Sequence, residues 1–225
     1  MKKFRQVDRR KIVELSKRSL KKEEGQKALH HLKNERKFSD EVIDDFDFGY
    51  CPEKINHPLC GRIITPIYDI FGNIVAISSR HLDKNHSNRF WHESFDKGSY
   101  LYGLLYAKEF IIKYKKVILV EGEFDVAALH SSGFKMTVGV CGSALTVFQV
   151  AMLSRYCSNM YVMFDGDKRG KEAIRRTKKI YSKYDLVSYG INFYPVYLPG
   201  NKDPDEYIRM EGRKKLQELL KQSKH

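Results

Sequence analysis

Apolar and polar positions in the first hundred residues follow two patterns, one typical of helices and one typical of strands. Apolar residues at helical spacing among many charges predict a helix over 8–24. Ser39 is a favourable N-cap for a second, short helix that ends near Phe46. The apolar runs 63–68 and 74–77 flank a turn that contains glycine and asparagine, which predicts a β-hairpin. The first part of the chain is therefore expected to mix helices with antiparallel strands.

After Tyr100 the pattern changes to a regular alternation of strands and helices. Short apolar runs bounded by turn-forming residues predict strands over 117–120, 136–140, 160–164 and 193–197. Longer amphipathic stretches predict helices over 124–132, 145–156, 168–183 and 204–222. Strands that alternate with helices in this way indicate a parallel sheet flanked by helices.

The composition suits a globular chain with affinity for polyanions. Hydrophobic residues make up 42% of the 225 residues and charged residues 31%. The formal net charge is +13, and a surplus of this size favours binding to phosphate-rich partners, although it also serves solubility. No apolar run is long enough to span a bilayer, and the basic N-terminus leads into polar sequence. We therefore expect a cytoplasmic protein with no membrane partner.

Three acidic clusters lie where predicted strands should end. They occupy residues 121–125, 165–167 and 203–206. Ligands of open α/β sheets bind beyond the carboxyl ends of the strands, so carboxylates far apart in sequence can meet there. Any one cluster is often only a turn or a strand exit. Their occurrence after successive strands favours a site.

Such carboxylates predict a divalent-metal site. Neighbouring carboxylates repel each other unless a cation neutralises them, and oxygen ligands suit Mg²⁺ or Mn²⁺. Two or more such ions can hold the attacking and leaving oxygens of a phosphoryl displacement. Zinc is not expected, because the four cysteines lack the spacing of a zinc site. The predicted metal ligands are Glu121, Asp165, Asp167 and Asp203, with Asp125 and Asp205 as further candidates.

These motifs resemble the Toprim domain of DnaG-type bacterial DNA primases. The resemblance rests on Glu-Gly-x-x-Asp at 121–125, Gly-Ser-Ala-Leu-Thr at 142–146, Phe-Asp-Gly-Asp at 164–167 and a Leu-Pro-x-x-x-Asp-Pro-Asp stretch at 198–205. Toprim domains also occur in topoisomerases, recombination proteins and some nucleases. The acidic motifs alone therefore do not choose among these classes.

The N-terminal half distinguishes the primases from the other classes of Toprim protein. Segment 35–52 is similar to the segment that opens the primase RNA-polymerase core, 62–67 to its Arg-x-x-x-Pro-Ile hairpin, and 95–104 to its Phe-x-Lys-Gly-x-x-Leu-Tyr-Gly-Leu run. The resemblance covers about residues 26–212 with the motifs in the family's order. It implies an α/β fold in which a Toprim-type parallel sheet flanked by helices follows a smaller mixed α+β subdomain.

The resemblance also implies a basic ridge that guides template and nucleotides. By motif position, Arg80, Arg89 and Lys97 would supply it, with Arg62 as a weaker candidate. Arginine makes bidentate phosphate contacts and lysine acts as a point charge, although each of these residues could also be an ordinary solvated charge. The aromatic triplet at 90–92 would either stack on a base or form a buried edge of the hairpin, and the buried edge is slightly favoured.

Two features depart from the family pattern. Glu123 stands where these primases usually have an aromatic residue, so it would alter nucleotide binding or add a metal ligand. We also expect no zinc-binding or helicase-binding domain, which fits a phage or mobile-element replication system that borrows those functions or works without them. The expected organisation is a basic extension (1–25), an α+β subdomain (26–110), a Toprim domain (111–212) and a basic tail (213–225).

The implied activity is primer synthesis by two-metal nucleotidyl transfer. The expected partners are a single-stranded DNA template, nucleoside triphosphates and, in trans, a replicative helicase and a zinc-binding or template-recognition protein, in a bacterial cell or phage-infected host. Glu121, Asp165 and Asp167 would be catalytic, and Glu121 is also a candidate acid–base that the sequence does not distinguish from a metal ligand. Alternatives are a Toprim nuclease and a non-catalytic nucleic-acid-binding subunit. A topoisomerase is the weakest alternative.

Overall fold

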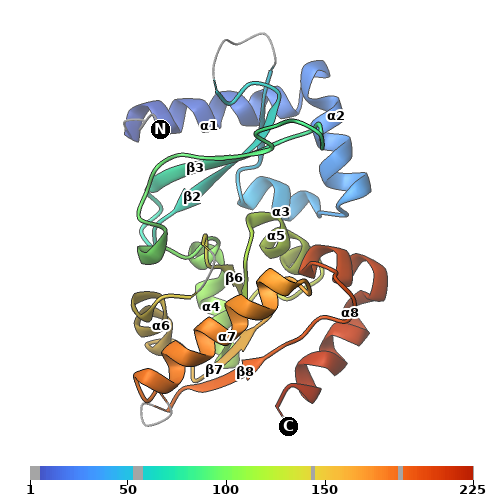
Figure 1. The fold of residues 1–225 in the computed structure, drawn as a ribbon. Helices are drawn as coiled ribbons and strands as arrows, with labels where there is room; N and C mark the ends of the chain where they lie inside the picture. Colours follow the sequence, from blue (N-terminus) through green and yellow to red (C-terminus); the bar gives the residue numbers. More distant parts are fainter. Residues whose placement is uncertain (1–5, 53–57, 143–144, 187–189, 225) are drawn as a thin grey trace. The chain divides into compact units, whose positions relative to one another are not determined.

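The computed structural model describes residues 6–52, 58–142, 145–186 and 190–224. The chain forms two compact units, Met1–Phe95 (unit 1) and Asp96–His225 (unit 2), shown in Figure 1. Among the described residues, no helix combines the length and the apolar character that a membrane-spanning helix needs.

Unit 1 combines helices with an antiparallel sheet. Its α-helices are α1 (Gln6–Leu20), α2 (Gln26–His30) and α3 (Asp40–Asp45). Its strands pair in the order β1-β2-β3-β4, with bounds β1 (Gly49–Cys51), β2 (Arg62–Tyr68), β3 (Ile74–His81) and β4 (Phe90–His92).

The predicted short helix and the predicted hairpin of unit 1 are both confirmed. Ser39 caps α3, because its hydroxyl accepts the backbone N–H of Val42 at 3.2 Å. In the β2–β3 turn, the Asp69 carboxylate accepts the backbone N–H groups of Phe71 and Asn73 at 2.8 and 2.9 Å. These local bonds explain why pattern alone located both elements.

A buried ion pair ties α1 to the rest of unit 1. The Arg9 guanidinium donates to both carboxylate oxygens of Glu93 at 2.9 and 2.7 Å and to the carbonyl of Ile74 at 3.2 Å. Val13 and Leu20 of the same helix are buried. Residues 6–20 of the segment expected as an extension thus contribute to the packing of unit 1.

Unit 2 is built on a parallel sheet with the strand order β6-β5-β7-β8. The strands are β5 (Lys116–Val120), β6 (Thr137–Gly139), β7 (Asn159–Val162) and β8 (Asn192–Pro195). Its helices are α4 (Leu104–Tyr114), α5 (Glu123–Ser131), α6 (Val147–Ser154), α7 (Lys168–Lys183) and α8 (Pro204–Gln222) (Figure 1).

The α/β class predicted from the alternating pattern is therefore confirmed. Residues 117–120 are completely buried, as an unbroken apolar run in a central parallel strand requires. The sequence pattern missed α4 and also missed a kink in α8, where Gly212 adopts a positive φ of 79°. Glycine tolerates this conformation without steric cost, so the kink separates two helical segments.

Candidate active site

The carboxyl ends of β5 and β7 bring the first two acidic clusters together. β5 and β7 are hydrogen-bonded neighbours, with Leu119 opposite Val162. Glu121 follows β5 and Asp165 follows β7 after two further residues. The Glu121 carboxylate accepts the backbone N–H of Asp165 at 3.3 Å, and both side chains are half-buried. Parallel pairing thus makes neighbours of two acids that are 44 positions apart.

The third cluster is held against the second by a close backbone approach. The N–H of Gly166 donates to the carbonyl of Lys202 at 2.9 Å. A Cβ at Gly166 would lie 2.7 Å from the carbonyl oxygen of Gly200 and 3.0 Å from that of Lys202. Only glycine leaves room for this contact. The loop that carries Asp203 therefore packs directly on the Asp-Gly-Asp turn.

The electrostatics of this edge fit a divalent cation. Burial raises the pKa of Asp165 to about 7, with Glu121, Asp203 and Asp167 contributing in the same direction. Burial also raises the pKa of Glu121, and Asp167 adds to that effect. Carboxylates that repel each other in this way gain most when a cation binds among them. The oxygen-only donor set fits Mg²⁺ or Mn²⁺.

The acidic side chains are electrostatic neighbours without forming a compact ligand set. In the described part of the chain, no three of them are grouped closely enough to hold a metal ion. Asp167 and Asp203 cap α7 and α8, since one oxygen of each accepts a backbone N–H, from Gly170 at 2.8 Å and from Glu206 at 2.6 Å. Both residues are half-buried, so they lie at the accessible edge of the sheet.

Asp125 and Asp205 occupy a different position from the other four acids. The Asp125 carboxylate is buried and accepts the N–H groups of Gly122 and Asp205, each at 3.2 Å. Burial raises the pKa of Asp125 well above its usual value, and Asp203, Asp165 and Asp205 add to the shift. Asp205 is 1% exposed and accepts Arg209 Nε at 2.7 Å. These contacts give both residues a structural role that joins α5 to α8.

The predicted basic residues fall in both units. Arg62 is buried in unit 1, where its guanidinium donates to the carbonyls of Pro58, Asn88 and Arg89. The structure thus uses Arg62 to hold the 88–89 loop. Lys97 is exposed and begins a 3-10 turn (Lys97–Ser99) in unit 2.

Arg80 and Arg89 flank an exposed aromatic ring. Their guanidinium carbons each lie 5.3 Å from the centre of the Phe90 ring, which is 54% exposed. The next residue, Trp91, packs against the buried cluster of Cys51, Leu59, Ile64 and Ile77. Pairing of β4 with β3 confirms that this triplet forms an edge of the hairpin, but the expectation that the edge is buried was wrong, because Phe90 is exposed and the other two residues are only half-buried.

Two further residues clarify the surroundings of the acidic clusters. Glu123 is the first residue of α5, where a negative side chain interacts favourably with the helix dipole. Sequence reasoning missed Gln149, a fully buried amide whose Nε2 donates to the carbonyls of Lys97, Tyr100 and Val140. The Thr-x-x-Gln spacing at 146–149 indicates a helix start, but it does not reveal these contacts. Ser143 and Ala144 of the Gly-Ser-Ala-Leu-Thr motif lie outside the described residues.

Comparisons of the sequence with known proteins point to one family. Residues 118–208 match a family model described as Toprim-like. A DNA primase of Aquifex aeolicus is 36% identical over 166 residues, which cover 72% of this chain and 32% of that protein. A DNA primase of Synechococcus elongatus is 32% identical over 244 residues, which cover 91% of this chain and 35% of the relative. The chain thus spans about a third of the length of these curated relatives.

Solved structures agree in fold. A DnaG catalytic core superposes with a TM-score of 0.84 at 25% identity, covering 94% of this chain and 77% of that one. The zinc-binding and RNA-polymerase domains of the Aquifex aeolicus primase superpose with a TM-score of 0.81 at 28% identity, covering 96% of this chain and 59% of that one.

Residues 118–208 of unit 2, which include most of the parallel sheet, form a Toprim domain. The chain as a whole is a homologue of the bacterial DnaG-type DNA primases, and it corresponds to their catalytic core rather than to a full-length primase.

Proposed function

We propose that this chain joins nucleoside triphosphates into short RNA primers on a single-stranded DNA template. The observation that carries the proposal is the set of half-buried carboxylates from three segments, Glu121, Asp165 and Asp203, at the carboxyl edge of the Toprim sheet. The names of the homologous proteins support primer synthesis over nucleic-acid cleavage.

We propose Mg²⁺ or Mn²⁺ as the cofactor, held by Glu121, Asp165, Asp167 and Asp203. Ions bound in such a site neutralise phosphate charge and favour ionisation of the attacking hydroxyl. We further propose that Glu121 accepts the proton of that hydroxyl, because burial raises its pKa above that of an ordinary glutamate and so makes it a stronger base. Asp125 and Asp205 act on this site by positioning the starts of α5 and α8.

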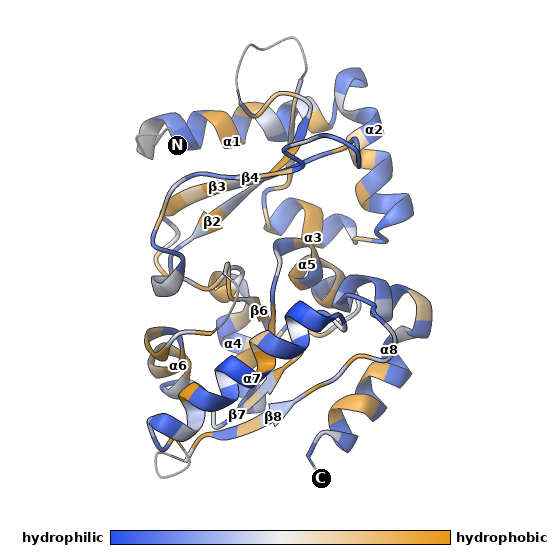
Figure 2. Cartoon of the chain, viewed as in Figure 1, coloured by the Kyte–Doolittle hydropathy of each residue, from blue (hydrophilic) through white to orange (hydrophobic). Residues whose placement is uncertain are grey.

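Template binding would come from basic side chains in both units. Arg80, Arg89 and Lys97 are our proposed phosphate contacts, and Phe90 offers a ring for base stacking. Helix α7 adds eight Lys and Arg against one Glu, and Figure 2 shows it as largely hydrophilic. Binding through many phosphate contacts should weaken steeply as salt concentration rises.

The test is a primer-synthesis assay on mixed single-stranded DNA templates with labelled nucleoside triphosphates and Mg²⁺ or Mn²⁺. We expect short labelled oligonucleotides from the wild-type chain. Asp165→Asn should lower their yield by about 100-fold, because it removes one proposed ligand charge. Glu109→Gln, an exposed acid on α4, is the matched control and should leave the yield unchanged.

The other outcomes separate the alternatives. Template degradation without added triphosphates, lost in Asp165→Asn, would indicate a Toprim nuclease. Template binding without any metal-dependent chemistry would indicate a binding subunit. If a zinc-binding protein or a replicative helicase acts in trans, as the family resemblance implies, adding either one should raise the primer yield.

A further inference from the structure

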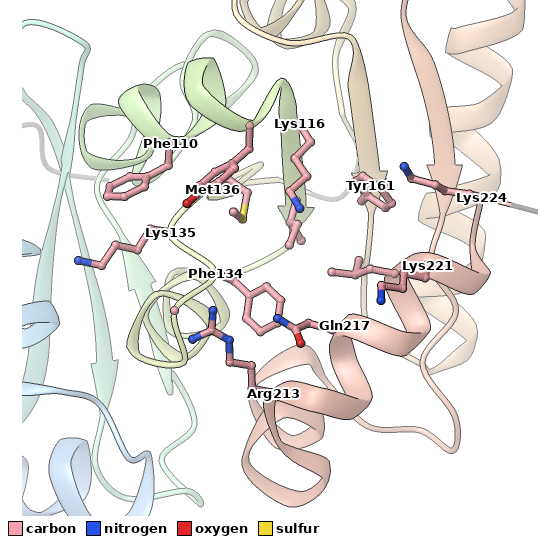
Figure 3. A pocket seen from close by; sticks show the side chains of 14 residues that line it. Phe110, Lys116, Phe134, Lys135, Met136, Tyr161, Arg213, Gln217, Lys221 and Lys224 are labelled. Carbon is pink, nitrogen blue, oxygen red and sulfur yellow. The ribbon is translucent and has the colours of Figure 1, made fainter.

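Unit 2 contains a pocket at the opposite end of the sheet from the acidic clusters. It has a volume of about 560 Å³ and lies between the end of α4, the start of β5, the segment before β6, and the second half of α8 (Figure 3). This volume is within the range of about 300–1,000 Å³ typical of small-molecule sites. Lys116 begins β5 and Glu121 follows its end, so the two sites are separated by roughly 16 Å of strand.

The lining of this pocket carries positive charge only. The lining contains no Asp or Glu. Its five basic side chains are Lys116, Lys135, Arg213, Lys221 and Lys224. Within the described chain, Lys116, Lys221 and Lys224 form no ion pair with a carboxylate. In Figure 3 the side chains of Lys116 and Lys221 project into the space between β5 and α8. Like charges held together without a counter-charge favour binding of an anion.

The pKa of Lys116, which lines the pocket, is consistent with anion binding. Burial lowers the pKa of Lys116, and the nearby Lys224 lowers it further. Both effects penalise the charged ammonium, and an anion in contact with it would offset them. The ligand expected here is therefore negatively charged, and the five basic side chains of the lining favour one with several negative charges.

Aromatic rings form part of the remaining wall. Tyr114 is 48% exposed and lies 5.7 Å from the Lys116 ammonium, so one ring is available for stacking. The Arg213 guanidinium lies over the Phe134 ring at 5.9 Å. Gly133, which lines the pocket beside Phe134, has a positive φ of 85°, a backbone conformation that glycine adopts without steric cost. An aromatic wall beside clustered cations suits a ligand with a flat ring and phosphates.

We propose that this pocket binds a nucleoside polyphosphate, with its phosphates at Lys116, Arg213, Lys221 and Lys224 and its base against Tyr114. The volume of about 560 Å³ is that of a single small-molecule site, which favours one nucleotide over a nucleic-acid strand, because a strand needs a groove that continues past the site. Unlike the acidic edge, a pocket lined by cations needs no divalent ion to hold phosphates. This site is thus additional to the proposed catalytic one.

Calorimetric titration of the whole chain with ATP in EDTA tests the proposal, because EDTA removes the divalent ions that nucleotide binding at the acidic edge would need. We expect one site per chain and an affinity that increases from AMP to ADP to ATP. Lys116→Gln/Lys221→Gln should weaken ATP binding at least tenfold. Arg10→Gln/Lys11→Gln, which removes two exposed charges from α1, should leave it unchanged.

A measurement on the wild-type chain avoids dependence on folding of the variant. ATP should protect Lys116 and Lys221, but not Lys11, from an amine-reactive label read by mass spectrometry. Absence of ATP binding, or equal affinity in the pocket variant, would overturn the proposal. So would tighter binding of a twelve-nucleotide oligo(dT), which would indicate a nucleic-acid surface, or equal binding of inorganic triphosphate, which would exclude recognition of the nucleoside. No template or primer synthesis is involved, so the result is independent of the proposed activity.

Discussion

Replacing Gln149 with methionine tests whether one buried amide holds the 97–100 segment in place. Gln149 is fully buried, and its Nε2 donates to the carbonyls of Lys97 at 3.1 Å, Tyr100 at 2.7 Å and Val140 at 3.1 Å. Its Oε1 accepts the N–H of Thr146 at 3.0 Å. Methionine keeps a similar volume but makes none of these bonds.

The expected loss follows from the groups left without a partner. A buried polar group that loses its hydrogen bond costs about 1–3 kcal/mol. The carbonyl of Val140 is buried, and the carbonyl of Tyr100 and the N–H of Thr146 are partly buried, so the lower bound of about 1 kcal/mol applied to each of the three gives a loss of about 3 kcal/mol. That loss corresponds to roughly two orders of magnitude in the unfolding equilibrium. The same change should release the turn that carries Lys97.

Two measurements report this loss. Urea unfolding followed by circular dichroism gives the change in free energy, and hydrogen exchange gives the local opening of 96–104. The only tryptophan, Trp91, lies in unit 1, so its fluorescence monitors that unit separately. Phe148→Ala is the control, since Phe148 is 60% exposed on the same helix and should change stability by no more than about 0.5 kcal/mol. A loss below about 1 kcal/mol for Gln149→Met, with unchanged exchange in 96–104, would refute the reasoning.

Three further predictions address other contacts. Gly166→Ala places a methyl group 2.7 Å from a carbonyl oxygen of the loop that carries the third acidic cluster, so primer yield should decrease at least tenfold; an unchanged yield would show that the loop adjusts. Arg9→Met removes the guanidinium that pairs with the buried carboxylate of Glu93 and should cost about 3–5 kcal/mol in urea unfolding, and a cost near zero would contradict this account. Burial lowers the pKa of His31, whose Nε2 accepts a hydrogen bond from Arg36 Nε. As the pH falls through 6.5, the imidazole of the unfolded chain therefore becomes protonated before that of the folded chain. Stability should therefore decrease from pH 7 towards pH 5, and His31→Gln should lack this component.

Most of the secondary structure could be predicted because it depends on neighbours in the chain. Short, mainly apolar runs located the four parallel strands to within two residues, and the helix predicted over 204–222 has those bounds. Ser39 and the turn at Asp69 act through hydrogen bonds to residues two to four positions away. The kink at Gly212 was missed, because an isolated glycine inside a helical pattern does not by itself indicate a positive φ.

The sequence by itself determined the α/β class, the family resemblance and the three acidic clusters of the candidate site. Only the tertiary structure distinguished the acids within those clusters. Glu121 and Asp165 meet because β5 and β7 pair, whereas Asp125 and Asp205 are buried in a contact between residues 80 positions apart. Only the tertiary structure also showed what Arg62 and Gln149 do, because their partners are carbonyls that no residue pattern identifies. Composition and spacing record which groups are present, but burial and long-range hydrogen bonds decide which of them stay accessible to a ligand.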